Sequence, residues 1–328
     1  MQTMQRWIGK LFQNPHLVTS DKNLLTNYGK KRLMENVVEV KNLTHYYGNK
    51  LVFENFNFEI KSGRIFGLLG KNGTGKTTTI NILNGFLKPT SGQCLMFGED
   101  SYKLSPETKA RVGFLIEGHI QYSFMSIKQI EKFYSAFYPK WKKEPYYELM
   151  AKLEVTQDQK LSKMSCGQRS QVALGLILAQ DPDLLILDDY SMGLDAGYRR
   201  LFLDYLIEYA KAEAKTIFIT SHIIQDLENF LDDCLIIDYR SVLVAMPIKE
   251  FQKTFKQYKF HVPNPEFRLS KNNIIKNYEI LKDKATVYTF SERPELEAYL
   301  NSLSINNSTV EEVPMTLEDA FIGITGKY

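Results

Sequence analysis

The chain has 328 residues, 44% of them hydrophobic and 24% charged, which is enough to bury a full core and to form more than one domain. Its apolar runs are far shorter than the roughly 20 residues of a membrane-spanning helix, and its N-terminus lacks a secretory pattern, so we expect a protein that stays in the cytosol. A net charge of +3 argues against a nucleic-acid partner, and three widely spaced cysteines argue against a disulfide framework or a zinc site.

Residues 1–33 form a polar, turn-rich extension, after which Met34 opens the first strand-like run. Apolar side chains in the extension follow the i, i+3, i+4, i+7 spacing of one helical face: Met4, Trp7, Ile8, Leu11 and Phe12. This spacing predicts an amphipathic helix. Two interpretations of the helix stay open: it lies on a membrane surface or a partner, or it packs on its own domain as an ordinary terminus.

Residues 34–245 alternate strand-like and helix-like patterns. The apolar runs RIFGLLG, LLILDD and TIFITS are typical of buried parallel strands. From about residue 118 to residue 175, a helical stretch rich in Lys, Tyr and Phe replaces the alternation, with interruptions expected at Pro139 and Pro145. We therefore predict an α/β domain that contains a helical subdomain.

Residues 246–328 show short strand and helix patterns of their own. The run KATVYTF has the composition of a strand, and ELEAYLNSL has the spacing of a helix. These patterns predict a small C-terminal accessory domain of the α+β type.

The strongest chemical signal is GKNGTGKTT, which follows the strand-like IFGLL and precedes the helix-like TTTINILNGF. It matches the phosphate-binding loop G-x-x-x-x-G-K-[ST] in the required context. Its glycines let backbone amides cradle phosphate oxygens at a helix N-terminus, Lys76 adds a charge for the β- and γ-phosphates, and Thr77 supplies a hydroxyl for Mg²⁺. The candidate ATP-binding residues of this loop are Gly70, Asn72, Gly73, Thr74, Gly75, Lys76, Thr77 and Thr78.

A bound nucleotide also needs an acidic group for its metal, and the run DLLILDDY supplies one at the end of a predicted buried strand. We assign Asp188 to Mg²⁺ through water, because the carboxyl ends of parallel strands form the ligand-binding edge of open α/β sheets. Asp189 points elsewhere on an alternating strand and is the candidate for positioning the attacking water. The plain alternative is that both acids cap a helix.

With these motifs in order, the sequence resembles the ABC transporter ATPases from roughly Val38 to Ile237. Where that family has a signature close to LSGGQ, this chain has MSCGQ, which runs from Met164 to Gln168. The resemblance implies that Ser165 and the amide of Gly167, beside Gln168, contact the γ-phosphate of ATP held by the opposite subunit. It therefore implies a head-to-tail dimer, in which the second ATP-binding subunit is either identical or different.

Further positions carry over from the family one at a time. Tyr47 resembles the aromatic residue that stacks on adenine, with Tyr46 as the alternative. Asp195 lies in a segment that resembles the loop contacting the opposite subunit. His222, directly after TIFITS, resembles the switch histidine that contacts the γ-phosphate, and we count it among the catalytic residues.

Three positions depart from the family pattern. Asp189 stands where the family usually has the one-methylene-longer Glu, so the carboxylate reaches less far toward the water. Glu117 replaces a Gln that links the metal site to the membrane subunit, and we assign it to both metal binding and catalysis. Cys166 replaces a signature glycine. Two interpretations follow: slow hydrolysis, which we favour, or ATP binding without turnover beside a catalytically complete partner subunit.

The tail EEVPMTLEDAFIGITGK resembles the ending of the drug- and antibiotic-export ATPases, a group with the daunorubicin and sodium exporter ATPases. This resemblance implies bacterial export through a separate membrane permease, which the helices between residues 118 and 163 would contact at the cytoplasmic face of the membrane. The alternatives are a soluble ATP-dependent clamp or regulator, which usually has tandem ATP-binding units or long coiled coils, and an importer ATPase, whose tail differs.

Overall fold

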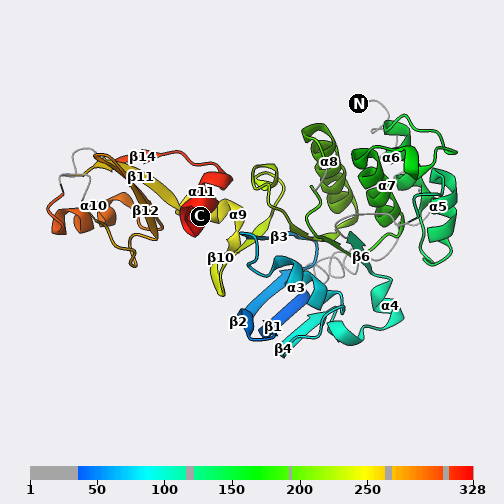
Figure 1. Cartoon of the computed structure of the whole chain (residues 1–328), viewed down its shortest axis with the longest axis horizontal. Helices are drawn as coiled ribbons and strands as arrows, with labels where there is room; N and C mark the ends of the chain where they lie inside the picture. The colour runs from blue at the N-terminus through cyan, green and yellow to red at the C-terminus, as the bar shows by residue number, and fades with distance from the viewer. Residues whose placement is uncertain (1–35, 116–121, 192–193, 263–267, 306–309, 328) are drawn as a thin grey trace, which may run out of the picture. The chain divides into compact units, whose positions relative to one another are not determined.

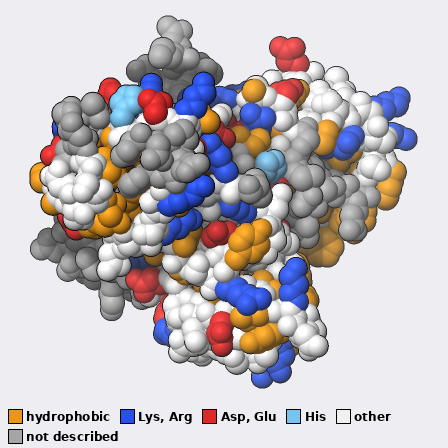
Figure 2. All heavy atoms as spheres, turned by 60° about the vertical axis from the view of Figure 1, so that its left-hand side comes forward, with side chains coloured by type: hydrophobic (Ala, Val, Ile, Leu, Met, Phe, Trp, Pro, Cys, Tyr) orange, Lys and Arg blue, Asp and Glu red, His pale blue; other side chains and the backbone are white. Residues whose placement is uncertain are grey.

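The computed structural model describes residues 36–115, 122–191, 194–262, 268–305 and 310–327. The predicted amphipathic helix within residues 1–33 lies outside these ranges. No helix in the described ranges is both long and apolar enough to span a membrane. The surface shown in Figure 2 carries basic, acidic and apolar side chains in mixture.

A six-stranded sheet forms the centre of the fold and confirms the α/β prediction. Its strand order is β10-β9-β3-β8-β7-β6, and all neighbours are parallel except β10, which runs antiparallel to β9. The strands are β10 (Ser241–Pro247), β9 (Asp233–Asp238), β3 (Ile65–Gly70), β8 (Thr216–Thr220), β7 (Leu184–Leu187) and β6 (Val112–Leu115). Every residue of β3, β7 and β8 is buried, as their apolar runs predicted.

An antiparallel sheet with the order β2-β1-β4-β5 covers one side of the centre. It comprises β1 (Asn36–Tyr47), β2 (Lys50–Lys61), β4 (Ser91–Met96) and β5 (Glu99–Asp100). Its apolar face shares a core with α3 (Lys76–Leu83) and the central sheet, as Val38, Ile80 and Ile186 show. Figure 1 shows α3 beside β1 and β2. This core therefore fixes the helix that follows the phosphate loop.

Helices α7 (Cys166–Ala179) and α8 (Ala196–Glu213) lie on the other side of the central sheet, and α5 (Ile127–Ser135) and α6 (Lys143–Lys152) pack against α7. Pro145 does not interrupt a helix, contrary to our expectation. It lies in the first turn of α6, where the backbone needs no N–H donor. Short elements complete the region: η1 (Ser101–Lys103), α4 (Pro106–Lys109), η2 (Leu161–Lys163) and η3 (Gln225–Leu227).

The C-terminal part contains a third, antiparallel sheet with the order β12-β13-β11-β14. Its elements are α9 (Ile248–Thr254), β11 (Lys256–His261), β12 (Asn277–Leu281), β13 (Lys284–Thr289), α10 (Arg293–Ser302), β14 (Glu311–Val313) and α11 (Leu317–Thr325). Residues of β11, β13 and α10 form a separate small core. The fold is of the predicted α+β type. The predicted domain boundary at residue 245 falls inside β10, which pairs with the central sheet.

The last helix, α11, packs with the large core rather than with the small one. Its Leu317 and Ala320 belong to the same apolar cluster as the helices over the central sheet. Gly323 faces the ring of Tyr288 on β13, at a distance that leaves no room for a Cβ atom. α11 is therefore packed closely against β13.

Gly323→Ala should lower the free energy of unfolding by about 1–3 kcal/mol, because the added methyl group overpacks the contact with Tyr288. Urea unfolding measures this change. The matched control is Gly197→Ala in α8, where a Cβ atom meets Asp195 Oδ1 at an ordinary 3.4 Å. Equal stability of the two alanine variants would contradict the packing.

Candidate functional site

The phosphate loop connects the end of β3 to the start of α3. Gly73 has φ 79° and Gly75 has φ 104°, values that disfavour side chains with a Cβ atom. A Cβ atom on Gly75 would also lie 2.8 Å from Val52. Gly75 is the N-cap of α3, and no side chain accepts the amides of the first turn. Those amides are therefore available to an anion.

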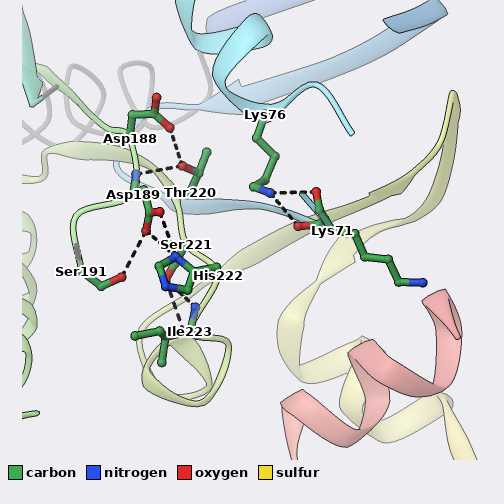
Figure 3. A network of polar contacts seen from close by, with 10 residues as sticks. Lys71, Lys76, Asp188, Asp189, Ser191, Thr220, Ser221, His222 and Ile223 are labelled. Carbon is green, nitrogen blue, oxygen red and sulfur yellow. Dashed lines mark hydrogen bonds and ion pairs between the residues drawn. The ribbon is translucent and has the colours of Figure 1, made fainter. Parts of the chain in front are cut away.

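Lys76 crosses the loop from the start of α3. Its Nζ donates to the carbonyl oxygens of Gly70 at 2.7 Å and Lys71 at 3.0 Å, as Figure 3 shows. Burial lowers the pKa of this ammonium, and the negative charges of Asp189 and Asp188 oppose that shift. The ammonium thus lies inside the loop, close enough to the two acids after β7 to feel their charge.

Of the other loop side chains, one is buried and bonds within the loop, and others are exposed. Thr74 is buried, and its hydroxyl donates to the Lys71 carbonyl at 2.8 Å. Asn72 and Thr77 are exposed. The hydroxyls of Thr78 and Tyr47 lie 3.5 Å apart. Thr74 is thus placed to shape the loop, while the others border its open side.

Asp188 lies directly after β7 and is buried. Its Oδ1 accepts a hydrogen bond from the hydroxyl of Thr220 at 2.9 Å, and the hydroxyl of Thr77 also bonds to the carboxylate. Burial raises the pKa of Asp188, while these two hydrogen bonds act to lower it. The carboxylate of Asp188, which follows β7, and the hydroxyl of Thr77, which lies in α3, are therefore in contact.

Asp189 turns toward His222, which follows β8. His222 Nδ1 lies 2.9 Å from Oδ1 and 2.8 Å from Oδ2 of the carboxylate (Figure 3). Ser191 donates to Oδ1 at 3.1 Å, and the Asp189 amide donates to the Thr220 hydroxyl at 3.0 Å. The backbone of Asp189 has φ 44°, a left-handed conformation that is uncommon outside glycine and concentrated at functional sites.

Neither acid caps a helix, so the plain alternative for them is wrong. The cap of α8 is Asp195, which accepts from the amide of Tyr198 at 2.9 Å. Thr220, whose single hydroxyl contacts both acids, was not predicted from the sequence. Its position at the end of TIFITS, two residues before His222, was the available signal.

The signature segment forms the start of α7. Ser165 is the N-cap: its Oγ accepts from the Gln168 amide at 3.1 Å, and the Gln168 side chain accepts from the Ser165 amide at 3.1 Å. Cys166 is exposed at the first helical position. Gly167 packs against the Tyr198 ring, where a Cβ atom would lie at 2.6 Å. These contacts present the segment as a rigid helix start.

Tyr46 and Tyr47 end β1, with exposed fractions of 38% and 51%. Tyr47 lies edge to face on His45, with ring centroids 4.8 Å apart. Both tyrosines thus keep an accessible ring surface. Glu117 lies outside the described residues, and its assignment stays a prediction.

The comparisons with known proteins agree on one family. The ABC transporter family matches residues 53–191. The bacitracin transport ATP-binding protein BcrA of Bacillus licheniformis is 30% identical over 309 residues, covering 89% of this chain and 98% of that protein. The Nod factor export ATP-binding protein I of Cupriavidus metallidurans is 32% identical over 210 residues, covering 62% of this chain and 69% of that protein.

A likeness to solved structures supports the fold. The ATP-binding cassette MJ0796, in a dimeric post-hydrolysis state with ADP and Pi, superposes with a TM-score of 0.56 at 21% identity. The match covers 64% of this chain and 98% of that one. The central part of the chain thus has the fold of an ABC ATPase cassette.

Thr220→Val should lower the free energy of unfolding by about 1–3 kcal/mol, because it leaves buried Asp188 and the Asp189 amide without this partner. Thr220→Ser is the matched control, since it keeps the hydroxyl. Chemical denaturation separates them. A valine variant as stable as the serine variant would contradict the bridging role.

Asp188→Asn should stabilise the protein without nucleotide. The pKa of this carboxyl is raised in the folded state, so ionising it costs stability. The protein therefore becomes less stable as the pH rises from the unfolded-state pKa to the folded-state pKa of Asp188, and it stays less stable above that window. The gain from Asp188→Asn should therefore grow through the acidic range, level off, and vanish below both pKa values. Unfolding free energies against pH test this, with exposed Asp158→Asn as control. A gain independent of pH would contradict the burial effect.

Proposed function

The chain belongs to the ABC transporter family as an ATP-binding subunit, and we propose that it closes on a second such subunit around MgATP and drives export through a separate membrane permease. The observation that carries this proposal is the convergence of Lys76, Asp188, Asp189 and His222 at the carboxyl ends of the neighbouring strands β3, β7 and β8. A phosphate-binding helix start and two acids at one sheet edge suit phosphoryl transfer.

The phosphates bind at the start of α3 in this proposal. The uncapped amides of the first turn and the field of the helix favour an anion there. Lys76 exchanges the carbonyls of Gly70 and Lys71 for β- and γ-phosphate oxygens. Asn72, Gly73, Thr74 and Thr78 complete the loop, and Tyr47 offers its exposed ring to adenine.

The residues present fit a magnesium ion. Asp188 and Thr77 bring hard oxygen ligands together, which Mg²⁺ prefers. In the described ranges no three His, Cys, Asp or Glu side chains gather as a metal site. This agrees with an ion held by one or two protein groups plus phosphate oxygens and water. When bound, Mg²⁺ supplies positive charge that offsets the charge developing on the phosphates. Glu117 is the further candidate ligand.

Asp189 and His222 are assigned to the water and the γ-phosphate. The Asp189 carboxylate is the candidate base, and its bond to Nδ1 orients the His222 ring and leaves Nε2 for the phosphate. Asp189 also accepts from Ser191, so much of its hydrogen-bonding capacity is already used. This favours the slow-hydrolysis interpretation.

The second subunit completes the site. Ser165 uses its oxygen to cap α7, and its hydroxyl proton stays available for a phosphate of the opposite subunit. The Gly167 amide and Gln168 lie in the same first turn. Either an identical chain or a related one serves as this partner.

Export is favoured over the clamp and importer alternatives by the length of the match to BcrA. That match covers 89% of the chain, so it extends beyond the predicted cassette of residues 34–245 into the C-terminal part. Bacitracin transport belongs to the relative, and a molecule of the antibiotic class is the corresponding proposal for this chain. The subunit then works at the cytoplasmic face of a bacterial membrane.

Lys76→Ala should weaken ATP binding by roughly 10- to 100-fold, the effect of losing a hydrogen bond between charged groups, and should abolish turnover. Steady-state ATPase assays with Mg²⁺ and equilibrium binding measure both. Exposed Lys88→Ala, placed after α3, is the matched control. Equal activity of the Lys76 and Lys88 variants would overturn the proposed site.

Asp189→Glu should raise turnover per folded molecule if side-chain reach limits the rate, and Asp189→Asn should abolish it. The glutamate adopts φ 44° less readily than aspartate, so the folded fraction must be measured alongside the rate. A glutamate variant that is no faster than the wild type excludes reach as the limiting factor.

A further inference from the structure

Lys71 is a buried lysine in the phosphate loop whose side chain turns away from the acids. Only 9% of its surface is exposed. Its Nζ donates to the backbone carbonyl of Thr325 at 2.9 Å. Figure 3 shows the side chain extending toward α11, whereas Lys76 reaches back across the loop. Residues 254 positions apart in the chain are thus joined at the loop.

The acceptor suits a cation. Thr325 is the last residue of α11, and the final carbonyls of a helix have no intrahelical partner and carry a partial negative charge. A lysine at a helix C-terminus satisfies such a carbonyl. Because a buried ammonium is costly unless it is hydrogen-bonded, the contact fixes the position of the Lys71 side chain.

The backbone carbonyl of Lys71 holds the side chain of Lys76, the residue proposed to bind phosphate. Its carbonyl accepts from Lys76 Nζ at 3.0 Å and from the Thr74 hydroxyl at 2.8 Å. The side chain of Lys71 therefore connects α11 to the backbone against which the Lys76 ammonium rests. A displacement of the α11 end moves this carbonyl.

α11 is also attached at its other end. Its first-turn Glu318 accepts a hydrogen bond from Gln225, which lies three residues after His222. Leu317 and Ala320 are buried, and Gly323 packs on the Tyr288 ring. The helix thus contacts both the phosphate loop and the segment that follows the switch histidine.

We propose that Lys71 is a positioning residue that lets α11 set the conformation of the phosphate loop and hence its affinity for nucleotide. This inference rests on the proposed function, because it concerns the same ATP site. Lys71 acts through its bond to Thr325 and through its own carbonyl, without touching the phosphates. The competing account is that Lys71 only adds positive charge near them.

Two matched pairs of variants separate these accounts. Lys71→Met removes the donor and the charge, whereas Lys71→Arg keeps both. Thr325→Pro displaces the last turn of α11, because proline removes the amide and clashes with the carbonyl of Phe321. Thr325→Ala leaves the backbone carbonyl in place. Gly323→Ala crowds Tyr288 and serves as the second helix variant if the proline variant does not fold.

The readout is the dissociation constant of the fluorescent analogue mant-ATP for the full chain, measured at fixed ionic strength. Lys71→Met and Thr325→Pro should each weaken binding roughly tenfold, and so should the double variant, because both break one connection. The arginine and alanine variants should bind within about twofold of the wild type. This non-additivity is a result that a change in charge alone does not produce.

Wild-type affinity in Lys71→Met, or additive losses in the double variant, would overturn the inference while leaving the ATP site intact. Absence of binding by the wild type would instead overturn the proposed function, and the inference with it. Lys76→Ala, which should bind more weakly than the wild type in every background, shows which of these failures has occurred.

Discussion

The parallel register of β3, β8 and β7 brings the groups of the candidate site together. Because the three strands run in the same direction, their carboxyl ends meet at one edge of the sheet. The phosphate loop, the two acids and His222 each follow one of these ends directly. Complete burial of the three strands keeps the edge rigid, so that short loops hold chemical groups in place.

Within this edge, Thr220 couples groups that have different tasks. Its hydroxyl donates to the proposed metal ligand Asp188 and accepts from the amide of Asp189, whose side chain holds His222. The Thr220 oxygen thus connects the carboxylate of Asp188 directly to the backbone of Asp189. The left-handed backbone of Asp189 belongs to the same arrangement, because it turns the carboxylate away from Asp188 and toward the histidine.

Local patterns were enough to predict three of the six central strands and to select the candidate residues. The apolar runs predicted β3, β7 and β8, and the glycine spacing predicted the loop, because each signal lies within a few consecutive residues. Pro145 was misjudged because its effect depends on its place in the helix. The contact between Lys71 and Thr325 joins residues 254 positions apart in the chain, and no short pattern reveals such a contact.

In the proposed function, this edge of the sheet binds MgATP between two subunits. The most direct measurement is the molecular mass of the Asp189→Asn protein in solution, with and without saturating MgATP, together with the number of nucleotides bound. Since this substitution should abolish hydrolysis but keeps the phosphate loop, we expect a nucleotide-dependent dimer with one ATP per subunit. Suppose instead that the protein is saturated with ATP but stays monomeric, both alone and with a candidate partner subunit. That result would contradict binding of MgATP between two subunits.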